Sequence, residues 1–250
     1  MTLSISESTQ NLDSCGHISD TTLSGCTNVD SAEIDLASLP KVYIGTPWPI
    51  PYISAGFCKS LRNMFVPFPH VFETMSSRFL ADSRNAIIDQ AIKGGFDYVM
   101  QLDADQQFKP DFFLRLWEVI KTHGEDAIAT GWAICKGGKF ANESSVYRVG
   151  TDDIVSVPVT ELEHRTEPFE VDAFGTCGFL ASTSFFKKLN PPWFADINII
   201  RDDLRMDEFH IATEFAMGQD LTFGIRAKEA GAKLIVVPQM RMPHEDMRTI

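Results

Sequence analysis

The sequence has no apolar stretch that approaches the length needed to span a membrane, and it has few cysteines. The five cysteines are odd in number and lack the close paired spacing of a zinc site or a disulfide framework. The start of the chain lacks the basic residues and the apolar run of a signal peptide. These absences favour a reducing cytoplasm, which would be the host cytoplasm for a viral protein.

Positive charge is also scarce, since 22 basic residues face 34 acidic ones and the formal net charge is −12. Residues 1–40 contain no Lys or Arg and are rich in Ser, Thr and Asp. Nonspecific binding of polyanions is therefore not built into the overall charge. We expect residues 1–40 to form an acidic, largely irregular segment and residues 41–250 to form one α/β domain.

What the sequence does contain is a short apolar run that ends in two carboxylates. Residues 96–102 are brief, rich in β-formers and preceded by two glycines, which indicates a buried strand, and Asp103 and Asp105 follow directly. Ligands of α/β sheets bind beyond the carboxyl ends of the strands. Side chains two residues apart on extended backbone point to the same side, so the pair favours Mg²⁺ or Mn²⁺ between its oxygens. The alternative is that the two acids begin a turn or cap the next helix.

Strands and helices alternate through the rest of residues 41–250, as in an α/β fold. Residues 64–72 read as an irregular or edge strand because they contain two prolines, and Pro238 is expected to end the last strand. Asp82 is a possible N-cap for the helix that follows it. The remaining expected strands are 41–45, 126–132 and 233–237, with short ones at 145–149 and 153–159. The expected helices are 52–61, 84–92, 110–124 with Pro110 at the first helical position, 183–189 and 218–231.

Two features near the start of the domain are candidates for nucleotide binding. Residues 46–51 contain three prolines and must form a loop after the first strand, which is a common nucleotide site and also a way to pack Trp48 into the core. Arg84 lies in the first turn of a predicted helix, where it reaches an anion or a base edge, or pairs with Asp82 on the surface.

Three later features have both a functional and a structural interpretation. Gly175 and Gly178 allow close approach of a ligand, or they mark a bend in a strand. Asp220 opens the last helix, where an acid is also an ordinary cap. His244 lies beyond the last strand, where a histidine completes a metal site or serves the structure alone.

Taken in order, these residues resemble the GT-A glycosyltransferases, and within them the family 2-like enzymes. The matching segments extend over residues 41–245 and include Ser83-Arg84-Asn85, Leu102-Asp103-Ala104-Asp105, Gly175-Thr176-Cys177-Gly178-Phe179, Gly218-Gln219-Asp220 and His244. The resemblance implies a single GT-A domain, Rossmann-like, with a mixed and mostly parallel central sheet. It also implies a hexosyl- or pentosyltransferase that moves a sugar from a nucleotide-diphosphate sugar, most readily a UDP-sugar, to an acceptor hydroxyl with Mn²⁺ or Mg²⁺.

The resemblance further assigns roles to individual residues. Asp220 matches the general base of inverting members, although a retaining outcome stays open. Gln219 departs from many relatives, which carry an acid before that Asp, so the acceptor contact made by that acid is in doubt. The implied nucleotide-sugar-binding residues are Thr46, Pro47, Arg84, Asp103, Ala104 and Asp105. The implied metal ligands are Asp103, Asp105 and His244, and the implied acceptor or sugar pocket holds Gly175, Thr176, Gly178 and Gln219.

Other functions fit the sequence less well. A nucleotidyltransferase of related core would carry a Gly-rich basic loop where residues 45–49 stand, and a haloacid-dehalogenase-type phosphatase would carry a small β-branched residue where Gln107 stands. A nucleotide-sugar-binding protein without turnover remains an alternative. The acceptor is open between a glycan, a protein and a modified nucleic-acid base, the last as in a DNA-modifying glycosyltransferase of a bacterial virus. A nucleic-acid acceptor would need a local basic face, for which the candidates are Lys136, Lys139, Arg148, Arg201 and Arg205.

Overall fold

The computed structural model describes residues 35–48, 53–77, 79–136, 142–150, 153–195 and 218–245. Contacts within the chain separate Met1–Asp35 from a unit that comprises Leu36–Ile250. The expectation for residues 1–40 falls mostly outside the described residues, which begin at residue 35. The first described element is the short 3₁₀ helix η1 (Leu36–Ser38), at the start of the second unit. No helix among the described residues is long and apolar enough to cross a membrane.

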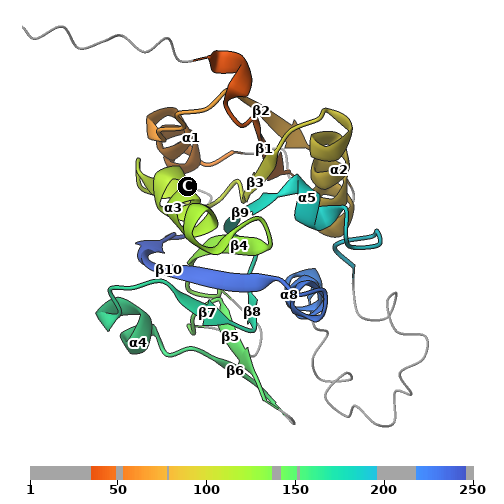
Figure 1. Cartoon of the computed structure of the whole chain (residues 1–250). Helices are drawn as coiled ribbons and strands as arrows, with labels where there is room; N and C mark the ends of the chain where they lie inside the picture. Colours follow the sequence, from red (N-terminus) through yellow and green to blue (C-terminus); the bar gives the residue numbers. More distant parts are fainter. Residues whose placement is uncertain are drawn as a thin grey trace, which may run out of the picture. The chain divides into compact units, whose positions relative to one another are not determined.

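A seven-stranded sheet forms the centre of the domain, in the order β2-β1-β3-β9-β4-β10-β7 (Figure 1). Its strands are β1 (Val42–Pro47), β2 (His70–Met75), β3 (Tyr98–Leu102), β4 (Ala127–Trp132), β7 (Phe169–Val171), β9 (Gly178–Ser182) and β10 (Lys233–Arg241). β1 runs parallel to β2 and β3, and β4 runs parallel to β10, whereas β9 is antiparallel to both of its neighbours and β7 to β10. The sheet is mixed and mostly parallel, as the resemblance to GT-A glycosyltransferases implies.

Helices cover both faces of this sheet because its strands are apolar on both sides. Helices α1 (Ala55–Asn63) and α3 (Phe112–His123) pack on one face, and α2 (Leu80–Lys93), α5 (Thr183–Phe186) and α8 (Gln219–Glu229) pack on the other (Figure 1). β1 illustrates the two-sided burial, since Tyr43 joins the α2 side while Val42 and Ile44 join the α3 side.

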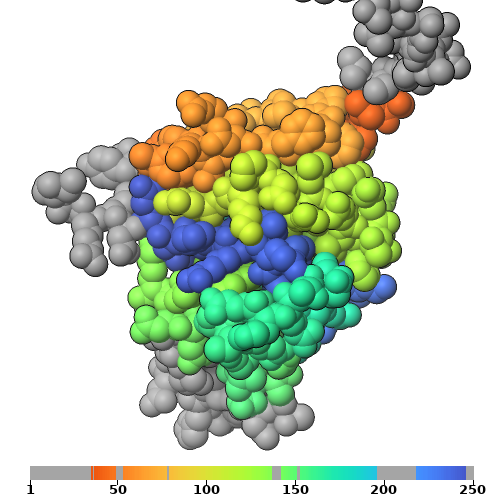
Figure 2. All heavy atoms as spheres, turned by 90° about the vertical axis from the view of Figure 1, so that its left-hand side faces the viewer, coloured from red at the N-terminus to blue at the C-terminus, as the bar shows by residue number. Residues whose placement is uncertain are grey.

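A smaller sheet and one more helix complete the domain beside β10. The smaller sheet has the order β6-β5-β8, from β5 (Val146–Val149), β6 (Ile154–Ser156) and β8 (Ala173–Phe174). Helix α4 (Val159–His164) lies between β6 and β8 in the chain. Figure 2 shows the surface of β10, in blue, between the yellow-green of α3 and the teal of α4. The sequence predicted both short strands of the polar region to within three residues of where they occur.

Two prolines lie inside strands, which corrects the prediction that each stands outside one. Pro47 is the last residue of β1, and it pairs only with β2 because the pairing of β1 with β3 ends at Gly45. The N–H group that proline lacks is therefore not needed for a hydrogen bond to β3. Pro238 lies within β10, between Val236 and Arg241, where the register with β4 shifts. A proline is tolerated at such an irregularity because the regular ladder is already interrupted there.

Two other boundaries differ from the sequence prediction. Helix α2 begins before Asp82, with Phe79 as its N-cap and no side-chain cap hydrogen bond, so Asp82 lies in the first turn and not at the cap. Strand β2 begins at His70, after most of the apolar run 64–72, and it is an edge strand as expected. In both cases the start of the element differs from the one that the local sequence, a cap residue or an apolar run, predicts.

Candidate active site at the carboxyl ends of the central strands

The centre of the site is a buried arginine on α2. Arg84 is 1% exposed, and its Nη2 atom donates to Oδ1 and Oδ2 of Asp103 at 2.8 and 3.1 Å. Its Nη1 atom donates to the carbonyl oxygen of Thr176 at 3.1 Å and to Oε1 of Gln101 at 3.3 Å. Asp103 and Gln101 share one face of β3 and its extension, so α2 brings the guanidinium onto the end of that strand.

The same arginine reaches a second carboxylate, on α8. Its Nε atom lies 3.8 Å from Oδ1 of Asp220, which stands in the first turn of α8. That oxygen also accepts a short hydrogen bond from Oγ1 of Thr176. Arg84 thus contacts both Asp103, after β3, and Asp220, at the start of α8. The guanidinium group is shared by the residues predicted to bind the donor and to activate the acceptor.

Negative charge exceeds positive charge in this cluster. Burial raises the pKa of Asp103 above its ordinary value, and the carboxylates of Asp220 and Asp105 raise it further, while Arg84 acts in the opposite direction. In the described part of the chain, the three carboxylates form ion pairs with two basic side chains, Arg84 and Lys136. An additional cation at this place would stabilise the ionised carboxylates.

Asp105 lies where a late segment of the chain returns to the loop after β3. The main-chain N–H of Glu245 donates to the carbonyl oxygen of Asp105 at 2.8 Å, and His244 forms an isolated β-bridge with Gln106. Oδ2 of Asp105 accepts a hydrogen bond of 2.9 Å from Nζ of Lys136. The sequence separation between Asp105 and His244 is thus closed by main-chain contacts, as their proposed joint role requires.

These residues fit a divalent cation that is also held by phosphate. Within the part of the chain that the structure describes, no three His, Cys, Asp or Glu side chains gather closely enough to hold a metal by themselves. Mg²⁺ and Mn²⁺ sites in nucleotide enzymes often use one or two protein ligands and complete the shell with phosphate oxygens and water. Oδ2 of Asp105 already contacts a positive charge, the ammonium group of Lys136, so this oxygen is accessible to a cation. Asp103, by contrast, is committed to Arg84.

Unpaired polar atoms mark the same edge of the sheet. Among the described residues, the buried side-chain nitrogen and oxygen atoms without a hydrogen-bond partner belong to Thr46, Trp48, Ser83, Arg84, Gln106 and Gln219. These residues lie at the end of β1, at the start of α2, after β3 and at the start of α8. Because buried polar groups are almost always paired, a cluster of unpaired ones at one sheet edge indicates a ligand site.

A search of families of known proteins supports this interpretation. The family described as glycosyl transferase family 2 matches residues 54–189, which is more than half of the chain. The chain belongs to glycosyl transferase family 2. The matched segment contains α1, α2, β3 with Asp103 and Asp105, and the Thr176 loop, and it ends before α8.

Solved structures show the fold of this family 2 member. The crystal structure of A197 from STIV matches with a TM-score of 0.56 and 15% identity, over 82% of this chain and 85% of that one. The crystal structure of GalNAc-T7 with UDP, GalNAc and Mn²⁺ matches with a TM-score of 0.53 and 14% identity, over 83% of this chain. The match spans 44% of the GalNAc-T7 chain, less than half of its length. No curated protein sequence matches. The expected GT-A fold and the family 2 resemblance are confirmed.

The remaining predicted residues of the family 2 domain lie around the cluster in different ways. The main-chain N–H of Ser54, the N-cap of α1, donates to the carbonyl oxygen of Ala104 at 3.3 Å. Thr46 and Pro47 end β1, and Oγ1 of Thr46 is buried and unpaired. Gln219 is the first residue of α8, and its Oε1 atom is also buried and unpaired.

The loop between β8 and β9 contributes Thr176 to the site, and the glycines on either side of it, Gly175 in the loop and Gly178 at the start of β9, are closely packed. A Cβ on Gly178 would lie 2.7 Å from Sδ of Met242, and one on Gly175 would lie 3.0 Å from Cβ of Ser145. Both glycines therefore meet protein atoms. Between them, the carbonyl oxygen of Cys177 accepts from the N–H of Asp103 at 2.9 Å, which ties this loop to the end of β3.

Three residues in the cluster were not among the sites predicted from sequence. Gln101 was detectable, because a glutamine in the middle of an apolar strand, two residues before Asp103, has to face the same side as that acid. Gln106 and Glu245 gave no such signal, since their positions depend on the return of the chain after β10.

The basic residues proposed for a nucleic-acid face do not form one in the described part of the chain. Lys136 contacts Asp105, and Arg148 pairs with Glu161 at 2.6 Å. Lys139, Arg201 and Arg205 lie outside the described residues.

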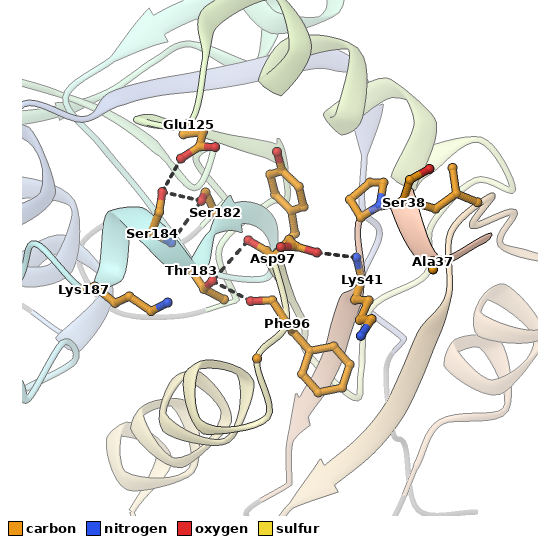
Figure 3. A pocket seen from close by; sticks show the side chains of 14 residues that line it. Ala37, Ser38, Lys41, Phe96, Asp97, Glu125, Ser182, Thr183, Ser184 and Lys187 are labelled. Carbon is orange, nitrogen blue, oxygen red and sulfur yellow. Dashed lines mark hydrogen bonds between the residues drawn. The ribbon is translucent and has the colours of Figure 1, made fainter. Parts of the chain in front are cut away.

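A separate hollow of about 560 Å³ lies at the opposite end of the strands (Figure 3). Several of its polar groups pair with one another: Asp97 accepts from the main-chain N–H of Lys41, Thr183 donates to the carbonyl oxygen of Phe96, and Ser184 donates to Glu125 (Figure 3). None of the unpaired buried atoms of the described residues belongs to its lining. Its chemistry therefore differs from that of the carboxyl-end cluster.

Proposed function

We propose that this family 2 glycosyltransferase moves a sugar from a nucleotide-diphosphate sugar to an acceptor hydroxyl, with Mn²⁺ or Mg²⁺ and with inversion. The observation that carries the proposal is the Asp103–Arg84–Asp220 arrangement, in which one buried cation fixes a carboxylate at the strand end opposite a carboxylate at a helix start. A donor and an acceptor held on either side of that arrangement would have their reacting atoms close together.

The donor would bind on the β1–β3 side of the cluster. The unpaired polar atoms of Thr46 and Trp48 are suited to the base and ribose, and Asp103 and Ala104 form the adjoining strand end. A UDP-sugar is the donor we favour, since GalNAc-T7, which shares the fold, is seen with UDP, GalNAc and Mn²⁺. Asp105 and His244 would hold the metal, which supplies positive charge to the diphosphate leaving group.

Asp220 would act as the general base. Its Oδ1 atom accepts from Thr176 and contacts Arg84, whereas its Oδ2 atom has no hydrogen-bond partner among the described residues. The side chain is 33% exposed, so an acceptor hydroxyl is able to reach the remaining oxygen. Removal of the hydroxyl proton by Oδ2 as the oxygen attacks the sugar carbon from the side opposite the diphosphate would give inversion.

The test is release of UDP from a panel of UDP-sugars, in which water replaces the unknown acceptor. We expect Mn²⁺-dependent release by the wild type and at least a hundredfold slower release by Asp220→Asn, with UDP binding retained. Asp89→Asn, which removes only an exposed helical ion pair with Lys93, is the matched control and should match the wild type. Tight UDP binding without release from any sugar would favour a binding protein without turnover.

A further inference from the structure

Among the residues that the structure describes, Lys136 is the one basic side chain that forms an ion pair with Asp105, the outer carboxylate of the site. Its Nζ atom lies 2.9 Å from Oδ2 of Asp105 and 3.4 Å from the carbonyl oxygen of Glu245. The residue follows β4, and the neighbouring Cys135 is anchored by its main-chain N–H to the carbonyl oxygen of Glu143 at 2.8 Å. The hydrogen bond of Cys135 anchors the backbone directly before Lys136, and the lysine side chain reaches Asp105 from there.

The two acids of the cluster are paired in different ways. Asp103 is held by a 1% exposed arginine with two short contacts, a buried pair that is costly to separate. Asp105 is held by a single contact from a lysine whose side chain is 44% exposed, and an exposed pair of this kind is weak. The first pair is thus a permanent part of the site, and the second can be exchanged.

A divalent cation on Asp105 and the ammonium of Lys136 compete for one place. Like charges at contact distance repel each other, so a metal bound to Asp105 would displace the lysine. A nucleoside diphosphate that arrives with the metal brings several anionic oxygens within reach of the displaced side chain. Lysine suits this exchange because its ammonium is a compact charge with three donors on a flexible stem.

We propose that Lys136 is an exchangeable counter-ion of the donor site, which neutralises Asp105 in the free protein and moves to the diphosphate when metal and nucleotide bind. This inference rests on the proposed function. It makes binding of metal and nucleotide cooperative, because the metal alone has to displace the lysine, whereas the metal with a nucleotide offers it a new partner.

The test is calorimetric titration of the whole chain with Mn²⁺ alone and then with UDP at saturating Mn²⁺. We expect Lys136→Met to bind Mn²⁺ about tenfold more tightly than the wild type, since the positive charge that competes with the metal is lost. We expect the same variant to bind UDP about tenfold more weakly, since a positive charge that attracts the diphosphate is lost. Lys136→Arg keeps the charge and should stay within about threefold of the wild type in both titrations. Lys93→Met, which removes a remote ion pair with Asp89, is the control and should change neither affinity.

The opposite signs separate this role from a structural one, because general loosening of the site would weaken both affinities. Equal or weaker Mn²⁺ binding by Lys136→Met, or unchanged UDP binding, would overturn the inference and leave the proposed function standing. Absence of UDP and Mn²⁺ binding by the wild type would overturn the proposed function, and this inference with it.

Discussion

One nitrogen of Arg84 contacts both carboxylate oxygens of Asp103, although the two side chains come from a helix and from the strand that follows it in sequence. Arg84 is almost fully buried, so the pair is screened by little water and is sensitive to the loss of either member. The predictions below begin with this pair.

Replacement of Arg84 by Met should destabilise the protein by about 3 kcal/mol, because Asp103 and Asp220 lose their shared cation. Urea unfolding at neutral pH measures this loss. Arg115→Met, which removes an exposed helical pair with Asp111, should cost less than about 0.5 kcal/mol. Equal effects of the two substitutions would contradict the view that Arg84 supports the site.

Replacement of Thr176 by Val should lower kcat about tenfold and leave the KM for the donor unchanged, since the substitution frees Oδ1 of Asp220 without touching β1 or β3. Steady-state kinetics with a UDP-sugar measures the two constants separately. Thr176→Ser restores the hydroxyl and should restore most of kcat. A rise in KM with kcat unchanged would place Thr176 in the donor site and not beside the base.

Removal of the metal should abolish stabilisation by UDP. At a UDP concentration of about 100 times its dissociation constant, the folded protein should gain about 2.7 kcal/mol in the presence of Mn²⁺. Thermal unfolding with and without chelator measures the difference. The gain should also disappear in Asp105→Asn, and a gain that persists with chelator would show that UDP binding does not need the cation.

Replacement of Gly131 by Ala should destabilise the protein by about 1–3 kcal/mol, because a Cβ at this position in β4 would overlap the main-chain oxygen of Met240. A main-chain oxygen cannot rotate away as the end of a side chain can. Gly218→Ala is the matched substitution, since nothing lies within 4 Å of its Cβ and its φ is −56°. It should cost less than about 1 kcal/mol in the same urea unfolding experiment.

The sequence predicted the elements whose signals are local. Helix α3 has an apolar face and a glycine with positive φ after its last turn, and β3 has a short apolar run between glycines and acids, so both were located to within about two residues. The ends of β1 and β10 were misplaced because the tolerance for Pro47 and Pro238 depends on which neighbouring strand continues past them. That information is not present in the local sequence.

Four residues of the cluster were chosen from sequence, but their contacts were not predicted. Arg84, Asp103, Thr176 and Asp220 were all chosen from sequence, and the structure brings them together. The contacts of Arg84 with Asp103 and Thr176 were not predicted, since they depend on how α2 packs against β3 and on a loop 92 residues away in the sequence. The pairing of Lys136 with Asp105 likewise depends on where β4 ends relative to β3 in the sheet order.

The return of the chain after β10 also has a consequence for biosynthesis. The N–H of Gln107 bonds to the carbonyl oxygen of Pro243, the N–H of Glu245 to that of Asp105, and the N–H of Gly56 to Oε2 of Glu245, across 189 residues. A ribosome therefore makes α1 and the loop after β3 long before it makes the segment that fastens them together. A nascent chain that stops at Met242 would hold every strand of the central sheet and still lack these three bonds. Residues 243–245 can therefore fix the loop after β3 to α1 only after they have left the exit tunnel, as one of the last steps in forming this edge of the sheet.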